Sequence, residues 1–205
     1  MEKGTIKNNI LLFFEKRGGY AHTKELKEAV FRTSDVKALY EEGVLEKIKP
    51  GFYRLADLDY PENMSLSFVD VARAMPEGVL CLISALSYYD LTTFNLSEIY
   101  VAIRNHSYAP NILYPPVKVF YFRDRFYEPG IETITTEYGD VKLYNREKTV
   151  CDMFRYRNKL GEDLALEGLK NYLASQDADL YTLRQYAKIC QVKTVVFPYL
   201  KALVG

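Results

Sequence analysis

Residues 41–55 constrain the fold more than any other part of this sequence. The segment begins as the end of a helix, and Gly43 is placed to stop that helix. Two short runs of β-forming residues follow, separated by Pro50 and Gly51. Proline followed by glycine at the centre of a four-residue turn favours a type II turn. The segment therefore predicts a β-hairpin that comes directly after a helix.

Three helical segments are expected ahead of this hairpin, at about residues 5–17, 23–30 and 33–43. The first segment places apolar side chains on one helical face, at Ile6, Ile10, Phe13 and Phe14. Gly18 and Gly19 then end the helix. Three helices followed by a hairpin are typical of a winged helix-turn-helix, which we expect for residues 1–57. That module usually docks on DNA.

Residues 57–63 are polar, contain a proline and are expected to form a linker. The rest of the chain, residues 64–205, is predicted to be a second, mixed α+β domain. We expect helices at residues 65–75, 79–90, 146–158, 162–174, 179–190 and 194–204, and strands at residues 99–104, 117–123, 131–137 and 141–144. The fold class expected for the whole chain is therefore α+β.

The predicted DNA contacts follow from how a helix-turn-helix reads DNA. Its second helix enters the major groove, and the early residues of that helix reach base edges or phosphates. The expected contacts are Thr33, Ser34 and Lys37 in this helix, Tyr20, His22 and Lys24 at the start of the preceding helix, and Lys47, Lys49 and Arg54 in the wing. Asp35 and Glu41 would repel phosphates, so an ordinary solvated face or a protein-binding module is the alternative.

Charge is spread unevenly along a chain whose formal net charge is zero. Residues 1–56 carry 11 Lys and Arg against 8 Asp and Glu, a net charge of +3. The remainder carries 16 against 19, a net charge of −3. A small basic excess at the N-terminal end agrees with DNA contact, although no dominant basic stripe is present.

Signatures of other function classes are absent from the sequence. Cys81, Cys151 and Cys190 have no metal-binding spacing and are expected to be buried free thiols, which fits a reducing cytoplasm. No common nucleotide-binding, zinc-protease or serine-hydrolase motif occurs, so we expect no catalytic residue, metal or cofactor. The N-terminus lacks a signal-peptide core, and no apolar run is long enough to span a membrane.

Several sequence runs resemble AbiEi-type antitoxins, the transcription-regulator halves of bacterial abortive-infection (type IV) toxin–antitoxin pairs. The runs in the first part of the chain are residues 19–26, 36–45 and 50–55, and they look like the family's winged-helix domain. Residues 84–92, 98–103 and 144–153 are similar to its C-terminal domain. The resemblance spans nearly the whole chain, and the order of the motifs is more specific than any one of them.

This resemblance implies a regulator that binds inverted repeats in its own promoter and represses transcription. It also implies a cytoplasmic antitoxin that counteracts a nucleotidyltransferase-like toxin, with or without direct contact. The chain departs from the family pattern in the acidic pair Glu41 and Glu42, and in the turn at residues 49–52, where an Arg-Gly-Val type is more usual. Two alternatives remain open: an enzyme that modifies the toxin by phosphoryl transfer, and a protein-interaction adaptor.

Overall fold

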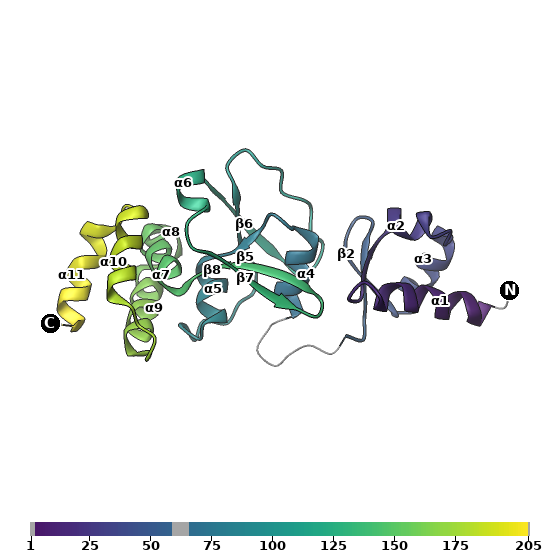
Figure 1. Cartoon of the computed structure of the whole chain (residues 1–205), viewed down its shortest axis with the longest axis horizontal. Coiled ribbons are helices and arrows are strands. Elements are labelled where there is room, and N and C mark those ends of the chain that lie inside the picture. Colours follow the sequence, from purple (N-terminus) through teal and green to yellow (C-terminus); the bar gives the residue numbers. More distant parts are fainter. Residues whose placement is uncertain (1–2, 59–65, 205) are drawn as a thin grey trace. The chain divides into compact units, whose positions relative to one another are not determined.

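The structure, a computed structural model, describes residues 3–58 and 66–204 and has the mixed α+β fold expected from the sequence (Figure 1). The predicted linker lies outside the described residues except for Asp57 and Leu58. The chain forms two compact units. The first comprises residues 1–76, 109–117 and 135–141, and the second comprises the remainder. This grouping does not follow the predicted division at residues 57–64.

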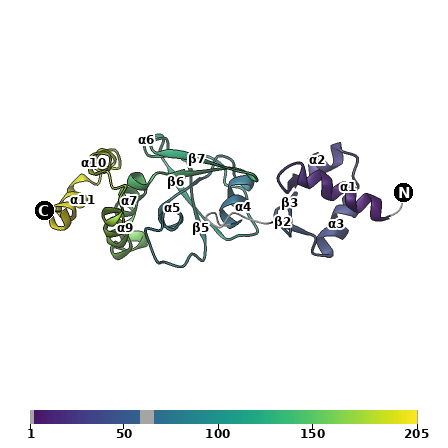
Figure 2. The same ribbon diagram turned by 60° about the horizontal axis from the view of Figure 1, so that its bottom comes forward.

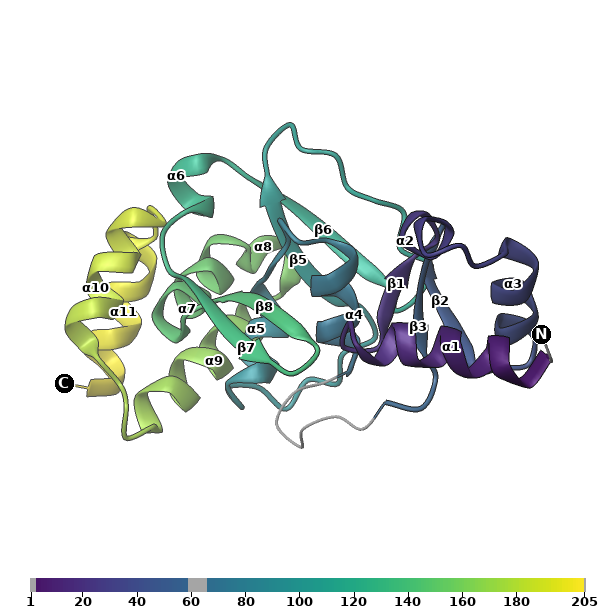
Figure 3. The same ribbon diagram turned by 45° about the vertical axis from the view of Figure 1, so that its right-hand side comes forward.

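The first unit contains the three predicted helices and the predicted hairpin, and it adds one short strand. Its elements are α1 (Lys3–Glu15), β1 (Tyr20–His22), α2 (Thr23–Glu28), α3 (Thr33–Glu41), β2 (Leu45–Lys49), β3 (Phe52–Leu55) and α4 (Leu66–Ala74). The strand β1 was not predicted, because it has only three residues and forms by pairing with a distant strand. The three strands make an antiparallel sheet in the order β1-β3-β2 (Figure 3).

The core of this unit joins the helices to the sheet. Its buried side chains come from α1, β1, α2, α3 and the hairpin, and they are Ile10, Phe14, Ala21, Leu26, Val36, Leu39, Leu45 and Leu55. The chain turns sharply after α1 because Gly18 and Gly19 have φ values of 67° and 82°, which glycine adopts without a steric penalty. The backbone N–H of Leu113 donates to Ile48 O at 2.8 Å, so residues 109–117 cover the outer edge of β2.

Most residues of a five-stranded sheet with the order β6-β5-β4-β8-β7 belong to the second unit, while residues 117, 135–136 and 139–141 of its strands are grouped with the first. Its strands are β4 (Val79–Leu80), β5 (Ile99–Arg104), β6 (Val117–Phe122), β7 (Ile131–Thr136) and β8 (Gly139–Tyr144). The predicted helix at residues 79–90 is wrong at its start, because Val79 pairs with Ala102 in β5 and Leu80 with Leu143 in β8. A short apolar run of this kind does not distinguish a buried strand from a helix.

Helices complete the second unit, and those after β8 lie beside one another (Figure 2). They are α5 (Leu82–Tyr88), α6 (Asp124–Tyr127), α7 (Arg146–Arg155), α8 (Arg157–Leu160), α9 (Glu162–Ala174), α10 (Leu180–Ile189) and α11 (Lys193–Val204). The predicted helix at residues 146–158 is divided into α7 and α8, and α6 was not predicted. The three cysteines are buried free thiols, as expected. Within residues 3–58 and 66–204, no helix has both the length and the apolar character needed to cross a bilayer.

Candidate nucleic-acid interface

The α2–α3 pair presents the first candidate surface. At the start of α2, the backbone N–H of His22 donates to Glu25 Oε2 at 2.6 Å, which satisfies one of the helix's unpaired amide groups. The helix ends where the N–H of Phe31 donates to Leu26 O at 2.9 Å. Val36 and Leu39 are buried and fix α3 against the core. The side of α3 that faces away from this core is therefore held in a defined orientation.

Three predicted contacts lie on the exposed side of α3. Thr33 and Ser34 are exposed in its first turn, and Lys37 follows them on the same side of the helix. The side chain of Lys37 is 73% exposed, and its Nζ lies 3.5 Å from Glu41 Oε1. An ion pair this exposed contributes little stability, so Lys37 can exchange Glu41 for another anion. The surface offers two hydroxyl groups and one cation within the first two turns of the helix.

The start of α2 contributes one exposed cation and one half-buried ring. The Lys24 side chain is 87% exposed, with a 4.0 Å ion pair to Glu28. The ring of His22 lies against Phe52, with the ring centroids 4.3 Å apart. Burial, followed by the nearby Lys49 charge, lowers the His22 pKa below its usual value, which favours the neutral ring. Lys24 is therefore better suited than His22 to contact a phosphate.

The β2–β3 hairpin presents the second candidate surface. Its turn is exposed at Pro50, and Gly51 has a φ of 72°, as the third position of a type II turn requires. Lys47 is partly exposed, with its Nζ 5.9 Å from the centroid of the Tyr53 ring. Lys49, by contrast, donates from Nζ to Ala74 O at 2.5 Å. Lys47 is thus available to a ligand, whereas Lys49 already has a partner within the protein.

Two predicted DNA contacts, Tyr20 and Arg54, lie in the protein interior, so the prediction that they contact DNA is wrong. They are 1% and 3% exposed, respectively. The Tyr20 hydroxyl donates to Asp70 Oδ1 at 2.7 Å, and Arg54 Nε lies 3.2 Å from the same oxygen. Arg54 also forms an ion pair with Glu46. Arg54 shares a strand face with the buried Phe52, and that alternation was the sequence signal for its burial.

Asp70 is the centre of this buried network and was not identified from the sequence. It is fully buried on α4, and burial raises the pKa of its carboxyl group to about 6. The Arg54 charge and the Tyr20 hydrogen bond act in the opposite direction but only partly offset the burial. The network joins α4 to β1 and β3 within the first unit, so it positions the hairpin without facing a ligand.

A polar pocket of about 370 Å³ is the main candidate site in the second unit. Its lining comprises Tyr89, Glu132, Asn145, Arg146, Glu147 and Asp177. Its charged groups already have partners: Arg146 lies 2.8 Å from Asp177, and Glu132 and Glu147 accept hydrogen bonds from the Tyr89 and Tyr172 hydroxyls. In the part of the chain that the structure describes, no group of three or more His, Cys, Asp or Glu side chains is placed to hold a metal ion.

The exposed candidates are therefore Lys24, Thr33, Ser34, Lys37 and Lys47, all on the first unit. They combine cations with hydroxyl groups, which suits contact with a phosphate backbone and base edges. No protein-family model matches the chain, and no curated protein matches it. The chemistry of these five side chains and the elements that carry them are the basis for a functional assignment.

Proposed function

We propose that this protein is a DNA-binding transcriptional regulator whose first 57 residues work as a winged helix-turn-helix. The observation that carries the proposal is the exposed first half of α3, where Thr33, Ser34 and Lys37 project from a helix anchored by Val36 and Leu39. The sheet order β1-β3-β2 and the exposed turn of the β2–β3 hairpin support the same assignment. In this proposal α3 is the recognition helix and the hairpin is the wing.

Each exposed side chain has a distinct role in the proposed complex. Thr33 and Ser34 donate to base edges or phosphates from the first turn of the recognition helix. Lys37 neutralises a phosphate or donates to guanine, and Lys24 contacts the backbone beside the groove. Lys47 reaches the backbone from the wing. Glu41 disfavours nearby phosphates, so it restricts how closely the end of α3 can approach the duplex.

The proposed DNA target is an operator containing inverted repeats in the protein's own promoter, so that the protein represses its own synthesis. This part of the proposal rests on the resemblance to AbiEi-type antitoxins. So does the second activity that we assign, opposition to a nucleotidyltransferase-like toxin. Co-expression with the product of an adjacent gene measures that activity directly. Equal growth arrest with and without this protein would remove the antitoxin assignment and leave DNA binding untouched.

A binding titration tests the DNA assignment. The full chain is titrated against a labelled duplex from the region upstream of its own gene, in the presence of unlabelled duplexes of shuffled sequence. We expect the upstream duplex to bind more tightly, and Ser34→Ala with Lys37→Ala to reduce that preference. Lys170→Ala is the matched control, because Lys170 is an exposed lysine on α9, in the second unit. Equal affinity for upstream and shuffled duplexes would overturn the operator assignment.

A further inference from the structure

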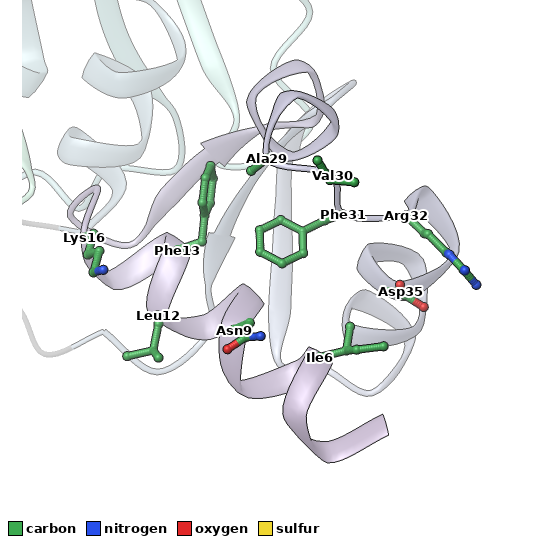
Figure 4. A pocket seen from close by; sticks show the side chains of 10 residues that line it. All are labelled: Ile6, Asn9, Leu12, Phe13, Lys16, Ala29, Val30, Phe31, Arg32 and Asp35. Carbon is green, nitrogen blue, oxygen red and sulfur yellow. The ribbon is translucent and has the colours of Figure 1, made fainter. Parts of the chain in front are cut away.

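A hollow of about 900 Å³ lies between α1 and the turn that joins α2 to α3 (Figure 4). Leu12 and Phe13 line it from α1, and Val30 and Phe31 line it from the turn. The Phe13 and Phe31 rings pack edge to face, with centroids 5.5 Å apart. We call this surface the α1 groove. Most of its middle is apolar, and Asn9 is the polar side chain that lies among these apolar groups (Figure 4).

Two apolar side chains of the α1 groove are exposed to solvent. Leu12 is 50% exposed and Val30 is 87% exposed. Single exposed apolar residues are ordinary on protein surfaces. Here both belong to the same hollow as the two phenylalanine rings, and adjoining apolar groups of this kind often mark an interaction site. Burying Leu12 and Val30 against a partner would remove their apolar surface from water.

The backbone at Val30 gives an independent reason to assign a role to its side chain. Val30 has a φ of 66°, a left-handed conformation that is unfavourable for a β-branched residue. Its N–H donates to Lys27 O at 2.9 Å, in the turn that ends α2. Glycine would form this turn without strain. The strain at Val30 therefore comes from its side chain and not from the turn itself. Residues held in strained backbone conformations cluster at functional sites.

The charges at the two ends of the α1 groove are arranged so that the groove complements itself. Lys16 lies at one end, and Arg32 and Asp35 lie at the other (Figure 4). Glu15, the last residue of α1, is exposed and precedes Lys16 in the chain, but it does not itself line the groove. Among the residues that the structure describes, no side chain forms an ion pair with Lys16, Arg32 or Asp35. With Glu15 counted beside the lining at the first end, each end carries one positive and one negative group.

From these features we infer that the α1 groove is the contact between two copies of this chain. The copies pack about a two-fold axis with their α1 helices antiparallel. This arrangement brings Lys16 of one copy to Asp35 of the other, and Glu15 to Arg32, twice in each dimer. A two-fold contact uses the same patch on both copies, so the patch must complement itself. Leu12 and Val30 supply the apolar surface that becomes buried.

The proposed contact does not include the candidate DNA contacts, although Arg32 and Asp35 flank Thr33 and Ser34 in the sequence. Thr33, Ser34 and Lys37 do not line the α1 groove. Two copies joined through their grooves could each present α3 to DNA. Self-association does not rest on the proposed function, however, because it is measured without DNA. A protein that associates but binds no DNA would support the groove assignment and refute the DNA assignment.

The test compares charge-reversed variants of the full chain by sedimentation equilibrium across a wide concentration range. We expect the unmodified protein to form dimers. Lys16→Glu alone, or Asp35→Lys alone, should weaken its own dimer by about tenfold or more, because each places like charges opposite one another twice. Mixing the two variants should restore dimers, since the mixed pair has opposite charges at both ends. Restoration on mixing cannot result from misfolding of either variant.

Two further variants test whether association depends on the groove or on surface charge elsewhere. Val30→Gly should weaken dimers. Compared at a concentration where both proteins are monomeric, it should raise the melting temperature, because it relieves the backbone strain at a φ of 66°. Lys27→Glu is the matched control, since it reverses an exposed charge on α2 outside the groove lining and should leave association unchanged.

Three results would overturn the inference. The first is a protein that stays monomeric at every concentration. The second is association that none of the groove variants changes, which would place the contact elsewhere. The third is a monomer that binds an apolar fluorescent probe and loses it in Leu12→Glu, which would mean that the groove holds a small apolar molecule instead of a second copy.

Discussion

Lys37 and Arg54 both belong to the first unit and carry the same charge, but they are suited to different tasks. Lys37 is 73% exposed and has one exposed partner, whereas Arg54 is 3% exposed and lies between Glu46 and Asp70. The buried Lys148, paired with Asp152 in the core of the second unit, resembles Arg54 in this respect. The comparison teaches that a basic residue near the proposed DNA surface is suited to contact DNA only if its charge has not already been neutralised inside the protein.

The different tasks of Lys37 and Arg54 have a physical cause. Moving a charge from water into the protein interior is costly, so a buried cation keeps its charge only with fixed anionic partners. Those partners are then part of the fold, and exchanging them for a phosphate would break it. An exposed pair such as Lys37–Glu41 is solvated in either state and separates at little cost. Buried charges should therefore govern stability, and exposed charges should govern binding.

The largest loss of stability is expected from breaking the Lys148–Asp152 ion pair. Lys148→Met leaves the Asp152 carboxyl group buried without its cation and should lower the free energy of unfolding by about 3–5 kcal/mol. Urea denaturation measures this loss. Lys170→Met, at an exposed position, should change it by less than about 0.5 kcal/mol. If Lys148→Met unfolded at the same urea concentration as the unmodified protein, burial of this charge would have no role in stability.

The second-largest change in stability is expected from the titration of Asp70, so it depends on pH. Its carboxyl pKa is about 6 in the folded protein, above the ordinary value of 3.8 expected in the unfolded chain. The folded state therefore binds this proton more tightly, so the contribution of Asp70 to stability is greatest below pH 4 and is lost as the pH rises to about 6. The loss is at most roughly 3 kcal/mol.

Asp70→Asn provides the comparison for that pH dependence, because it removes the titrating group. The free energies of unfolding of the two proteins are measured from pH 4 to pH 8. The unmodified protein should lose stability relative to Asp70→Asn as the pH rises. The opposite slope would mean that Arg54 holds the Asp70 pKa below its usual range.

The smallest change in stability is expected at the exposed pair on α3. Glu41→Gln removes the partner of Lys37 and should alter the free energy of unfolding by less than about 0.5 kcal/mol. The same substitution removes a negative charge beside the proposed DNA surface, so affinity for DNA should increase. Thermal unfolding and a DNA titration on the same samples compare the two quantities. Weaker DNA binding by Glu41→Gln would indicate that Glu41 accepts a hydrogen bond from a base.

The parts of the fold with strong local signals were predictable from the sequence. The i, i+4 spacing of Ile10 and Phe14 predicted α1, and Pro50 with Gly51 predicted the β2–β3 hairpin. Helical periodicity predicted that Val36, Leu39 and Tyr40 face inward; Val36 and Leu39 are buried, but the prediction is wrong for Tyr40, which is 45% exposed. In each case, residues close together in the sequence determine the structure.

Features that depend on distant pairing were not predictable. Strand β1 has three residues and exists because Tyr20 and His22 pair with Arg54 and Phe52. The same pairing places Tyr20 and Arg54 beside Asp70, which comes from a helix beyond the predicted linker. Strand alternation marked Arg54 as an inward-facing residue, but Asp70, the buried partner that holds both Tyr20 and Arg54, is not identified by local sequence patterns.

The most direct test of the central claim is the salt dependence of DNA binding by the unmodified protein and by Lys24→Ala with Lys37→Ala. If these exposed lysines contact phosphates, the double variant should bind about tenfold more weakly, and the slope of log affinity against log salt should fall by about 2. Arg54→Met, examined at a temperature where it remains folded, should keep the unmodified slope. An unchanged slope in the double variant, or a reduced slope in Arg54→Met, would contradict the division between exposed binding charges and buried structural charges.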